Sequence, residues 1–251
     1  MGIDMSGVRG LLVAGGTGSR LRPFTNYTHK TLLPLFNRPV IDYALKTIRQ
    51  AGISEITIIA NEHIGQIAKH LGSGGEGEKI HYVIEDEAKG VANALRLARP
   101  YIEGSRVMLY FADNITSWDF SDDVSKFEES EKTPGAVLLA REVEDPGSFG
   151  VCMMDEEGRV IDIVEKPEIP PSNLAIGGIY LFDERFWEYL DEETNGGDEG
   201  FSISKITRRY VKQGEAEIRN FGEGTWIDCG TPENLMKAGL MAMDGEITAE
   251  K

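Results

Sequence analysis

The sequence predicts an α/β fold in which a mainly parallel central sheet is followed by an antiparallel insertion. Through the first half of the chain, continuous apolar runs alternate with segments of helical periodicity. Buried strands that alternate with helices are typical of βαβ units, whose strands lie parallel in one sheet. In the second half this alternation gives way to a hairpin pattern and a proline-rich stretch.

Continuous apolar runs predict strands in the first half at residues 9–14, 55–60, 80–84, 106–112 and 136–141. Apolar residues at helical spacing predict a helix around 41–48, which Gly52 is expected to end. The same spacing predicts a second helix over 64–71, before the glycine-rich segment GSGGEGE. Strands and helices in this order form the expected βαβ units.

The second half of the chain predicts an antiparallel insertion. FGVCMM and RVIDIVEKP are interpreted as two strands of a hairpin, joined by a turn at 155–158. Pro167, Pro170 and Pro171 then interrupt the chain before another predicted strand at 175–182. We find no internal repeat and no low-complexity tail, so a single domain is expected over residues 1–251.

Composition and charge exclude several classes of partner. The 251 residues carry a net charge of −16, whereas a nucleic-acid-binding protein normally presents a basic face. No 18-residue apolar run is present and the first residues lack a signal-peptide pattern, so we expect a cytoplasmic protein with no membrane partner. The two cysteines and four histidines show no zinc-ligand spacing, and no disulfide is expected.

The stretch GGTGSR at residues 15–20 follows the first predicted strand, at the sheet edge where parallel α/β folds bind ligands. It matches neither the dinucleotide motif GxGxxG nor the P-loop, in which lysine directly follows the second glycine. Arg20, Arg22 and Lys30 stand in the turn or close behind it. Cations beside free backbone amides suit a polyphosphate, although a lone basic residue is more often a solvated surface charge.

Further positions are candidates for binding or catalysis. Asp113 ends a predicted strand and Asp228 lies between apolar residues and a turn, so each is either a metal ligand or a capping or turn residue. Glu165 and Lys166 end another strand, where a surface ion pair is the ordinary interpretation. Gly90 begins a helix, either as a cap or because a ligand approaches the backbone there.

Taken in order, these motifs resemble the sugar-1-phosphate nucleotidyltransferases, and most closely the short glucose-1-phosphate thymidylyltransferases. The opening GGTGSRLRPFT is followed by Lys30, by LLP and by Arg38-Pro39, and then by DEAKGVANAL, ADN, DPGSFGV, VEKPEIPPSN, AIGGIYLFD and WIDCGT. The resemblance implies a Rossmann-like three-layer nucleotidyltransferase fold with a mainly parallel sheet. Its nucleotide-binding part would span about 9–145, and its sugar-phosphate-binding part about 146–245.

The resemblance also implies roles for individual residues. The nucleoside triphosphate would be bound by Ala14, Gly15, Gly16, Thr17, Gly18, Ser19, Glu85 and Gly90. The sugar 1-phosphate would be bound by Gly150, Glu165, Lys166, Ile176 and Arg208. The match is looser around Arg208, where Lys205 and Thr207 replace the family's Asp and Asn.

The chemistry implied by the family is in-line displacement. An anionic oxygen of the sugar phosphate would attack the α-phosphorus, and pyrophosphate would leave. Arg20, Lys30 and Lys166 would be the catalytic cations, and Asp113 and Asp228 would hold Mg²⁺ against the α-phosphate.

The base remains open because thymidylyl enzymes usually carry Gln where this chain has Glu85. A carboxylate only accepts hydrogen bonds, either from N3–H of thymine or uracil or from two N–H groups of guanine. The surrounding motifs favour dTTP with glucose 1-phosphate; UTP or GTP with another hexose 1-phosphate is the alternative.

Oligomeric state and catalytic competence are also open. The chain stops about 20 residues after Asp228, whereas longer thymidylyltransferases continue into a helical segment tied to tetramer packing and to a regulatory nucleotide site. A homodimer or a monomer is therefore expected. A non-catalytic regulatory subunit of the same fold would be expected to lose the cations or carboxylates that are kept here. A Rossmann oxidoreductase is disfavoured by the missing third glycine.

Overall fold

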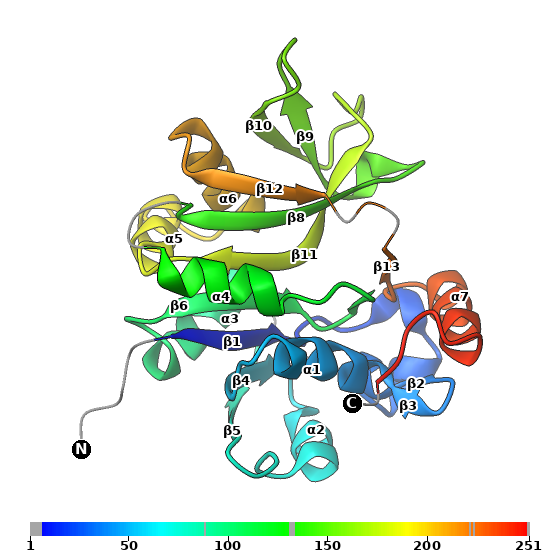
Figure 1. Ribbon diagram of the computed structural model, residues 1–251. Coiled ribbons are helices and arrows are strands. Elements are labelled where there is room, and N and C mark those ends of the chain that lie inside the picture. Colours follow the sequence, from blue (N-terminus) through cyan, green and yellow to red (C-terminus); the bar gives the residue numbers. More distant parts are fainter. Residues whose placement is uncertain (1–6, 88, 131–133, 221, 223, 250–251) are drawn as a thin grey trace.

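The computed structural model describes residues 7–87, 89–130, 134–220, 222 and 224–249. Its main sheet has nine strands, most of them side by side in the order β5-β4-β1-β6-β11-β8-β12 (Figure 1). Their bounds are β1 (Val8–Val13), β4 (Glu55–Ala60), β5 (Lys79–Ile84), β6 (Arg106–Phe111), β8 (Ala136–Glu142), β9 (Gly150–Met154), β10 (Val160–Glu165), β11 (Leu174–Phe182) and β12 (Ala216–Asn220).

The sheet is mainly parallel, as the sequence predicts. β5, β4, β1 and β6 run in one direction, and β8 and β12 are parallel to each other. β11 lies between β6 and β8 and is antiparallel to both. The predicted strands are confirmed to within one residue at each end, except that β10 ends at Glu165, two residues before the predicted end. β12 was not predicted, because its sequence AEIRN contains a single large apolar side chain, Ile218.

The predicted hairpin is confirmed as β9 and β10, which pair antiparallel around the turn at Asp155. It is attached to the first residues of β11, where Gly150 and Val151 pair with Ile176 and Ala175. β11 therefore contacts β9 at one end and β6 at the other. This arrangement joins the antiparallel insertion to the parallel sheet within one layer.

Helices cover both faces of this sheet and give three layers. One face carries α1 (Val40–Gln50), α2 (Ile64–Leu71) and α4 (Ser121–Glu129). The other carries α3 (Val91–Ala98), α5 (Phe186–Thr194) and α6 (Ile203–Lys212). Successive side chains of a strand point to opposite faces, so Leu11 and Leu12 of β1 are buried in different clusters.

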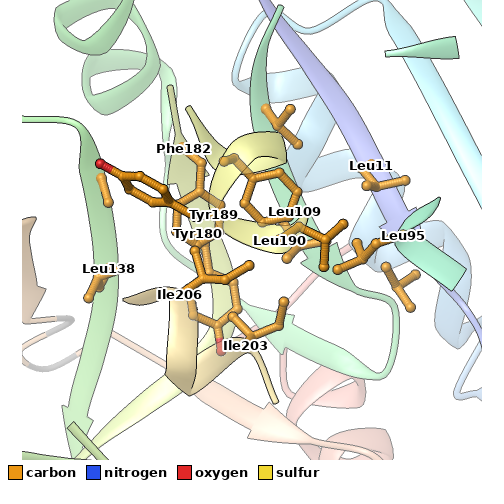
Figure 2. Close-up of a cluster of buried hydrophobic side chains, with 14 of the residues drawn as sticks. Leu11, Leu95, Leu109, Leu138, Tyr180, Phe182, Tyr189, Leu190, Ile203 and Ile206 are labelled. Carbon is orange, nitrogen blue, oxygen red and sulfur yellow. The ribbon is translucent and has the colours of Figure 1, made fainter. Parts of the chain in front are cut away.

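Figure 2 shows the cluster between the sheet and α3, α5 and α6. Leu95, Leu190 and Ile206 from the three helices pack with Leu11 of β1 and Leu109 of β6. Each fully buried aliphatic side chain of this kind stabilises the fold by about 1.5–3 kcal/mol relative to an exposed one. Because the cluster fixes β1 beside β6, it also fixes the strand ends from which the site is built.

The two predicted helices form where apolar spacing places them. α1 buries Ile41, Leu45 and Ile48 on one face. Gly52 follows its last turn with a φ of +84°, a conformation that glycine adopts without strain. α2 spans the predicted residues 64–71.

Short elements complete the fold beside the carboxyl ends of the parallel strands. They are β2 (Pro34–Leu35), β3 (Arg38–Pro39), β7 (Asn114–Thr116), β13 (Trp226–Asp228) and α7 (Pro232–Met243). Single 3-10 turns occur at η1 (Ser19–Leu21), η2 (Phe24–Asn26), η3 (Lys30–Leu32), η4 (Arg99–Tyr101) and η5 (Pro146–Ser148). A separate buried cluster that includes Leu35, Ile115 and Ile227 holds β2, β7 and β13 together.

No helix within the described ranges is long and apolar enough to cross a membrane. The prediction that a signal peptide is absent concerns the first ten residues, of which 1–6 lie outside the described part. Cys152 and Cys229 are both buried as free thiols, as expected.

Candidate active site

The glycine turn lies at the carboxyl end of β1. Ala14, directly after the strand, donates its amide to the Ile59 carbonyl at 2.8 Å. Gly18 has a φ of +61°, and a Cβ at this position would lie 2.9 Å from Thr25 Cγ2, so the turn requires glycine. Thr25 Oγ1 also donates to the Gly18 carbonyl at 2.8 Å. The segment that follows the turn therefore holds it in place.

Lys30 connects this turn to Asp113. Its Nζ lies 2.5 Å from Asp113 Oδ2, and the two side chains are only 16% and 15% exposed. The same Nζ is 3.8 Å from the point where a Cβ of Gly16 would lie. A hollow of about 380 Å³ borders the turn here and is lined by Gly16, Thr17, Lys30 and Asn61 among others. A shielded cation thus stands directly beside the turn's backbone.

Asp113 and Asp228 approach each other from distant parts of the chain. Asp113 follows β6, and Asp228 ends β13, which pairs with β7 just after Asp113. The Cys229 amide donates to the Asp113 carbonyl at 2.7 Å, which ties the two segments together. The two carboxylates predicted as metal ligands are therefore neighbours.

The surrounding charges shift the pKa values of Asp113 and Asp228 in opposite directions. Burial raises the pKa of Asp113, but the charge and hydrogen bond of Lys30, together with weaker contributions that include the charge of Arg20, hold this pKa below its usual range. Burial and then the charge of Asp113 raise the pKa of Asp228 above its usual range. Arg20 Nη2 and Asp228 Oδ1 each lie 2.7 Å from the point where a Cβ of Gly230 would be. The pair is thus flanked by two cations, and a further cation would relieve its repulsion.

The donor set fits Mg²⁺. This ion is usually bound through one or two carboxylates, with water and substrate phosphates completing its shell. Within the described ranges, no group of three or more His, Cys, Asp or Glu side chains forms a metal cluster. Asp113 and Asp228 would supply the two carboxylates of such a shell.

His29 precedes Lys30 and is buried, with 1% of its surface exposed. Its Nδ1 lies 2.8 Å from Thr31 Oγ1. Burial, followed by the charge of Lys30, lowers the pKa of His29 to about 4. The imidazole is therefore neutral at pH 7 and adds no charge beside the lysine.

We expect His29 to make the fold sensitive to acid. The pKa of His29 in the unfolded chain is about 6.5. Between about pH 6.5 and pH 4, the imidazole is therefore protonated in the unfolded chain but neutral in the folded protein. The contribution of His29 to the free energy of unfolding is therefore fully present above pH 6.5 and decreases as the pH falls. At pH 5 the free energy of unfolding is lower by about 2 kcal/mol. Urea unfolding at pH 7.5 and pH 5 should show a smaller pH-dependent loss for His29→Gln than for the wild type. Equal losses would contradict the assignment.

A pocket of about 380 Å³ opens at Asp113 and Asp228. Four of the residues predicted for the sugar phosphate line it: Gly150, Glu165, Lys166 and Ile176. Glu165 accepts a hydrogen bond from Ser204 of α6. A Cβ at Gly150 would lie 2.8 Å from Ser204 Oγ, so glycine leaves room for this contact. The structure thus brings the carboxylate pair and the predicted sugar-binding residues to one cavity.

Lys166 is the least constrained of these side chains. It is 66% exposed, and its Nζ lies 3.8 Å from Glu165 Oε1. Its backbone has a φ of +42°, which is unusual for a residue with a Cβ and costs about 1–3 kcal/mol. The Lys166 amide donates to the Phe149 carbonyl at 2.9 Å, which helps to hold this conformation. The ammonium therefore stands at the pocket edge on a strained, fixed backbone.

Several pocket residues were not predicted, and Asn114 is the most connected of them. Trp226 Nε1 donates to Asn114 Oδ1 at 2.9 Å, and the Tyr110 hydroxyl donates to its carbonyl at 3.0 Å. A Cβ at Gly178 would lie 2.5 Å from Asn114 Nδ2, so β11 can pass here only with glycine. Asn114 belongs to the FADN motif, and its place next to Asp113 in that motif could have indicated that it lies in the site. Trp226 begins WIDCGT, but nothing in its own spacing indicated a pocket.

Glu85 and Gly90 flank the loop between β5 and α3. Glu85 is 3% exposed, and its Oε2 lies 3.3 Å from the point where a Cβ of Gly15 would be. Glu85 therefore faces the glycine turn. Gly90 begins α3 with a φ of +100°, in agreement with its predicted place at a helix start.

The structure does not bring Arg208 to this pocket. Its guanidinium donates twice to Asp162 of β10, at 2.5 and 2.6 Å. It borders a separate hollow on the outer side of α6, together with Lys205, Arg209 and Lys212. The carboxylate of Asp162 thus holds Arg208 away from the position implied by the motif, and a role on the sugar phosphate requires this ion pair to open.

Comparison with known proteins identifies the family. The sequence profile of the nucleotidyl transferases matches residues 9–244. This chain is a member of that family. The sugar-1-phosphate nucleotidyltransferase superfamily predicted from the motifs is therefore confirmed, and a Rossmann oxidoreductase is excluded.

Individual relatives agree with this assignment. A glucose-1-phosphate thymidylyltransferase from Xanthomonas campestris pv. campestris is 33% identical over 234 residues, 92% of this chain and 79% of that protein. The low-salt glycan biosynthesis nucleotidyltransferase Agl11 of Haloferax volcanii is also 33% identical, over 94% of this chain but 66% of its own length. The crystal structure of a candidate glucose-1-phosphate thymidylyltransferase from Bacillus anthracis, in complex with sucrose, superposes with a TM-score of 0.89 and is 36% identical, covering 97% of this chain and 98% of that one. The predicted nucleotidyltransferase fold is confirmed.

Proposed function

We propose that this nucleotidyltransferase joins dTTP and glucose 1-phosphate to give dTDP-glucose and pyrophosphate. The observation that carries the proposal is the Lys30–Asp113 ion pair, with Asp228 beside it. It lies between a glycine turn suited to phosphates and the pocket that holds Glu165 and Lys166. A triphosphate and a sugar phosphate bound on these two sides would meet at the carboxylates.

In this proposal the nucleoside triphosphate binds along residues 14–19, with its phosphates facing the backbone amides of residues 15–19. Lys30 and Arg20 neutralise the triphosphate, with Arg20 on the departing pyrophosphate. Asp113 and Asp228 hold Mg²⁺, which when bound supplies charge neutralisation at the α-phosphate. Because the fold holds these cations in place before the reaction begins, they need not rearrange when the transition state forms.

The sugar 1-phosphate binds in the pocket, with its phosphate on Lys166 and its hydroxyls on Glu165, Gly150 and the backbone at Ile176. Its phosphate oxygen is already anionic at pH 7, so no general base is needed. The oxygen attacks the α-phosphorus in line, one P–O bond forms, and the bond to pyrophosphate breaks. Catalysis consists of positioning and charge neutralisation by the chain's own cations.

The choice of dTTP and glucose 1-phosphate is supported by the thymidylyl motifs and by the relative from Xanthomonas campestris. UTP or GTP, with another hexose 1-phosphate, is the alternative, since Glu85 departs from the usual glutamine. A non-catalytic subunit is disfavoured because Arg20, Lys30 and Lys166 are all present.

The proposal is tested by pyrophosphate release. Purified protein is supplied with Mg²⁺, glucose 1-phosphate and one of dTTP, UTP, GTP, ATP or CTP. We expect the fastest release with dTTP. Release only with another hexose 1-phosphate would correct the sugar, and no release with any combination would overturn the assignment as an enzyme.

A further inference from the structure

We propose that the outer face of α7 is a docking surface for a second copy of this chain, whose own α7 packs against it antiparallel about a twofold axis at Leu240. The proposed function does not use this surface. Figure 1 shows α7 at the edge of the molecule, beside β2 and β3.

The exposed face of α7 carries an apolar stripe. Met236, Leu240 and Met243 are 69%, 54% and 55% exposed, and they follow one another at spacings of four and three residues. Side chains at these spacings lie on one face of a helix. On the opposite face, Ala238 is buried in the cluster that holds β2, β7 and β13 together. Apolar side chains of α7 thus face both the core and solvent, and a helix of this kind is normally buried on both sides.

Phe36 extends the stripe from the turn between β2 and β3. Its amide nitrogen lies 4.0 Å from the point where a Cβ of Gly239 would be, so this turn is in contact with α7. Phe36 is 58% exposed, and its backbone has a φ of +59°, a strained conformation for a large side chain. A phenylalanine that is both strained and exposed stabilises neither the turn nor the core. Burial of its ring against another molecule would be favourable.

The positions of the side chains on α7 favour an antiparallel pairing. If two antiparallel copies of α7 cross at Leu240, residues that lie about equally far before and after Leu240 come to face each other. Met236 then meets the partner's Met243. On the other side of the stripe, Lys237 meets the partner's Asp244. Because a twofold axis matches each side of the helix to the same side of its copy, one crossing point provides all of these contacts.

Charge favours a second copy as the occupant of this face. Asp244 follows the end of α7, where the helix dipole disfavours negative charge, and the last turn, LMAM, contains no basic residue. The partner's Lys237 would supply the missing cation. A twofold dimer requires a face that is complementary to itself, and this face combines an uncharged stripe with charges of both signs. Such a face also lets two copies approach although each carries a net charge of −16.

The size of the face predicts how strong the dimer is. α7 has 12 residues, whereas a standard interface uses about 20–30 residues on each side. Pairing through α7 and the β2–β3 turn therefore forms a small interface. We expect a dimer that dissociates on dilution.

Sedimentation velocity of the full chain, from nanomolar to high micromolar concentration, tests the dimer. We expect a monomer at the lowest concentrations and a dimer at the highest. Leu240→Asp should raise the dissociation constant about 30-fold or more, because it places a charge opposite its own copy at the centre of the interface. Leu97→Asp is the matched control and should dimerise like the wild type, since Leu97 is a 40% exposed leucine on α3.

A charge swap tests the antiparallel register. Lys237→Glu and Asp244→Lys should each weaken the dimer by roughly 2- to 30-fold, because two exposed ion pairs are lost in every dimer. The double variant should regain most of the affinity, since each pair is re-formed with its signs exchanged. Circular dichroism melting shows whether each variant is folded. If Leu240→Asp fails to fold, the charge swap decides alone.

Three results would overturn the proposal. One is a wild type that stays monomeric at the highest concentration, including one that binds a different protein through this face. Another is a dimer that Leu240→Asp leaves intact. The third is a dimer that the double charge variant does not restore, which would refute the antiparallel register. No substrate is present in these measurements, so their result is independent of the proposed function.

Discussion

Asp113→Asn and Asp228→Asn are each expected to lower kcat by roughly 10²-fold or more while the protein stays folded. Removing a charge that stabilises a transition state typically costs this much. Asparagine keeps the size of the side chain, and its oxygen can still accept the 2.7 Å hydrogen bond that Gly230 donates to Asp228 Oδ1. The loss should therefore appear in the rate and not in the fold.

The measurement is pyrophosphate release at saturating substrates over a range of Mg²⁺ concentrations, with the melting temperature followed by circular dichroism. Asp191→Asn is the matched control, because Asp191 is half exposed on α5 and pairs with Arg99. Both active-site variants should also need more Mg²⁺ than the wild type. Near-normal rates for both, or full activity of the wild type in EDTA, would refute the carboxylate pair as the metal site.

Strands were predictable in this fold because the sheet is buried on both faces. Every residue of β1 is buried, so a strand such as VRGLLV is recognisable from composition alone. The same logic fails for β12, whose four other residues are small or polar around Ile218. It also fails for β7 and β13, three-residue strands that exist only because they pair with each other across more than a hundred residues.

The candidate site was predictable where one motif supplies both the residue and its position. Lys30 and Asp113 follow from their motifs, although only the folded chain shows that they form an ion pair. Arg208 shows the limit of this approach. A motif gives its position on α6, but the competing carboxylate comes from β10 and decides where the guanidinium lies.

Lys166→Ala is expected to raise KM for glucose 1-phosphate by about 10- to 100-fold while KM for dTTP changes little. A charge-assisted hydrogen bond to a phosphate contributes about 1.5–3 kcal/mol. Among the described residues, the ammonium of Lys166 pairs with Glu165 at 3.8 Å, and both side chains of this pair are partly exposed. The change removes the ammonium but keeps the Cβ, so the strain of the +42° backbone is the same in both proteins. Any difference therefore reports on the charge.

Initial rates are measured with each substrate varied in turn. Lys79→Ala is the control: Lys79 is also an exposed lysine paired with a glutamate, but it begins β5, at the opposite end of the parallel strands from the site. Its KM values should match the wild type. A loss of similar size toward dTTP and glucose 1-phosphate in Lys166→Ala would mean that Lys166 supports the pocket's shape. A loss confined to the sugar phosphate places the ammonium on its phosphate, because that is the one group of this substrate that carries charge.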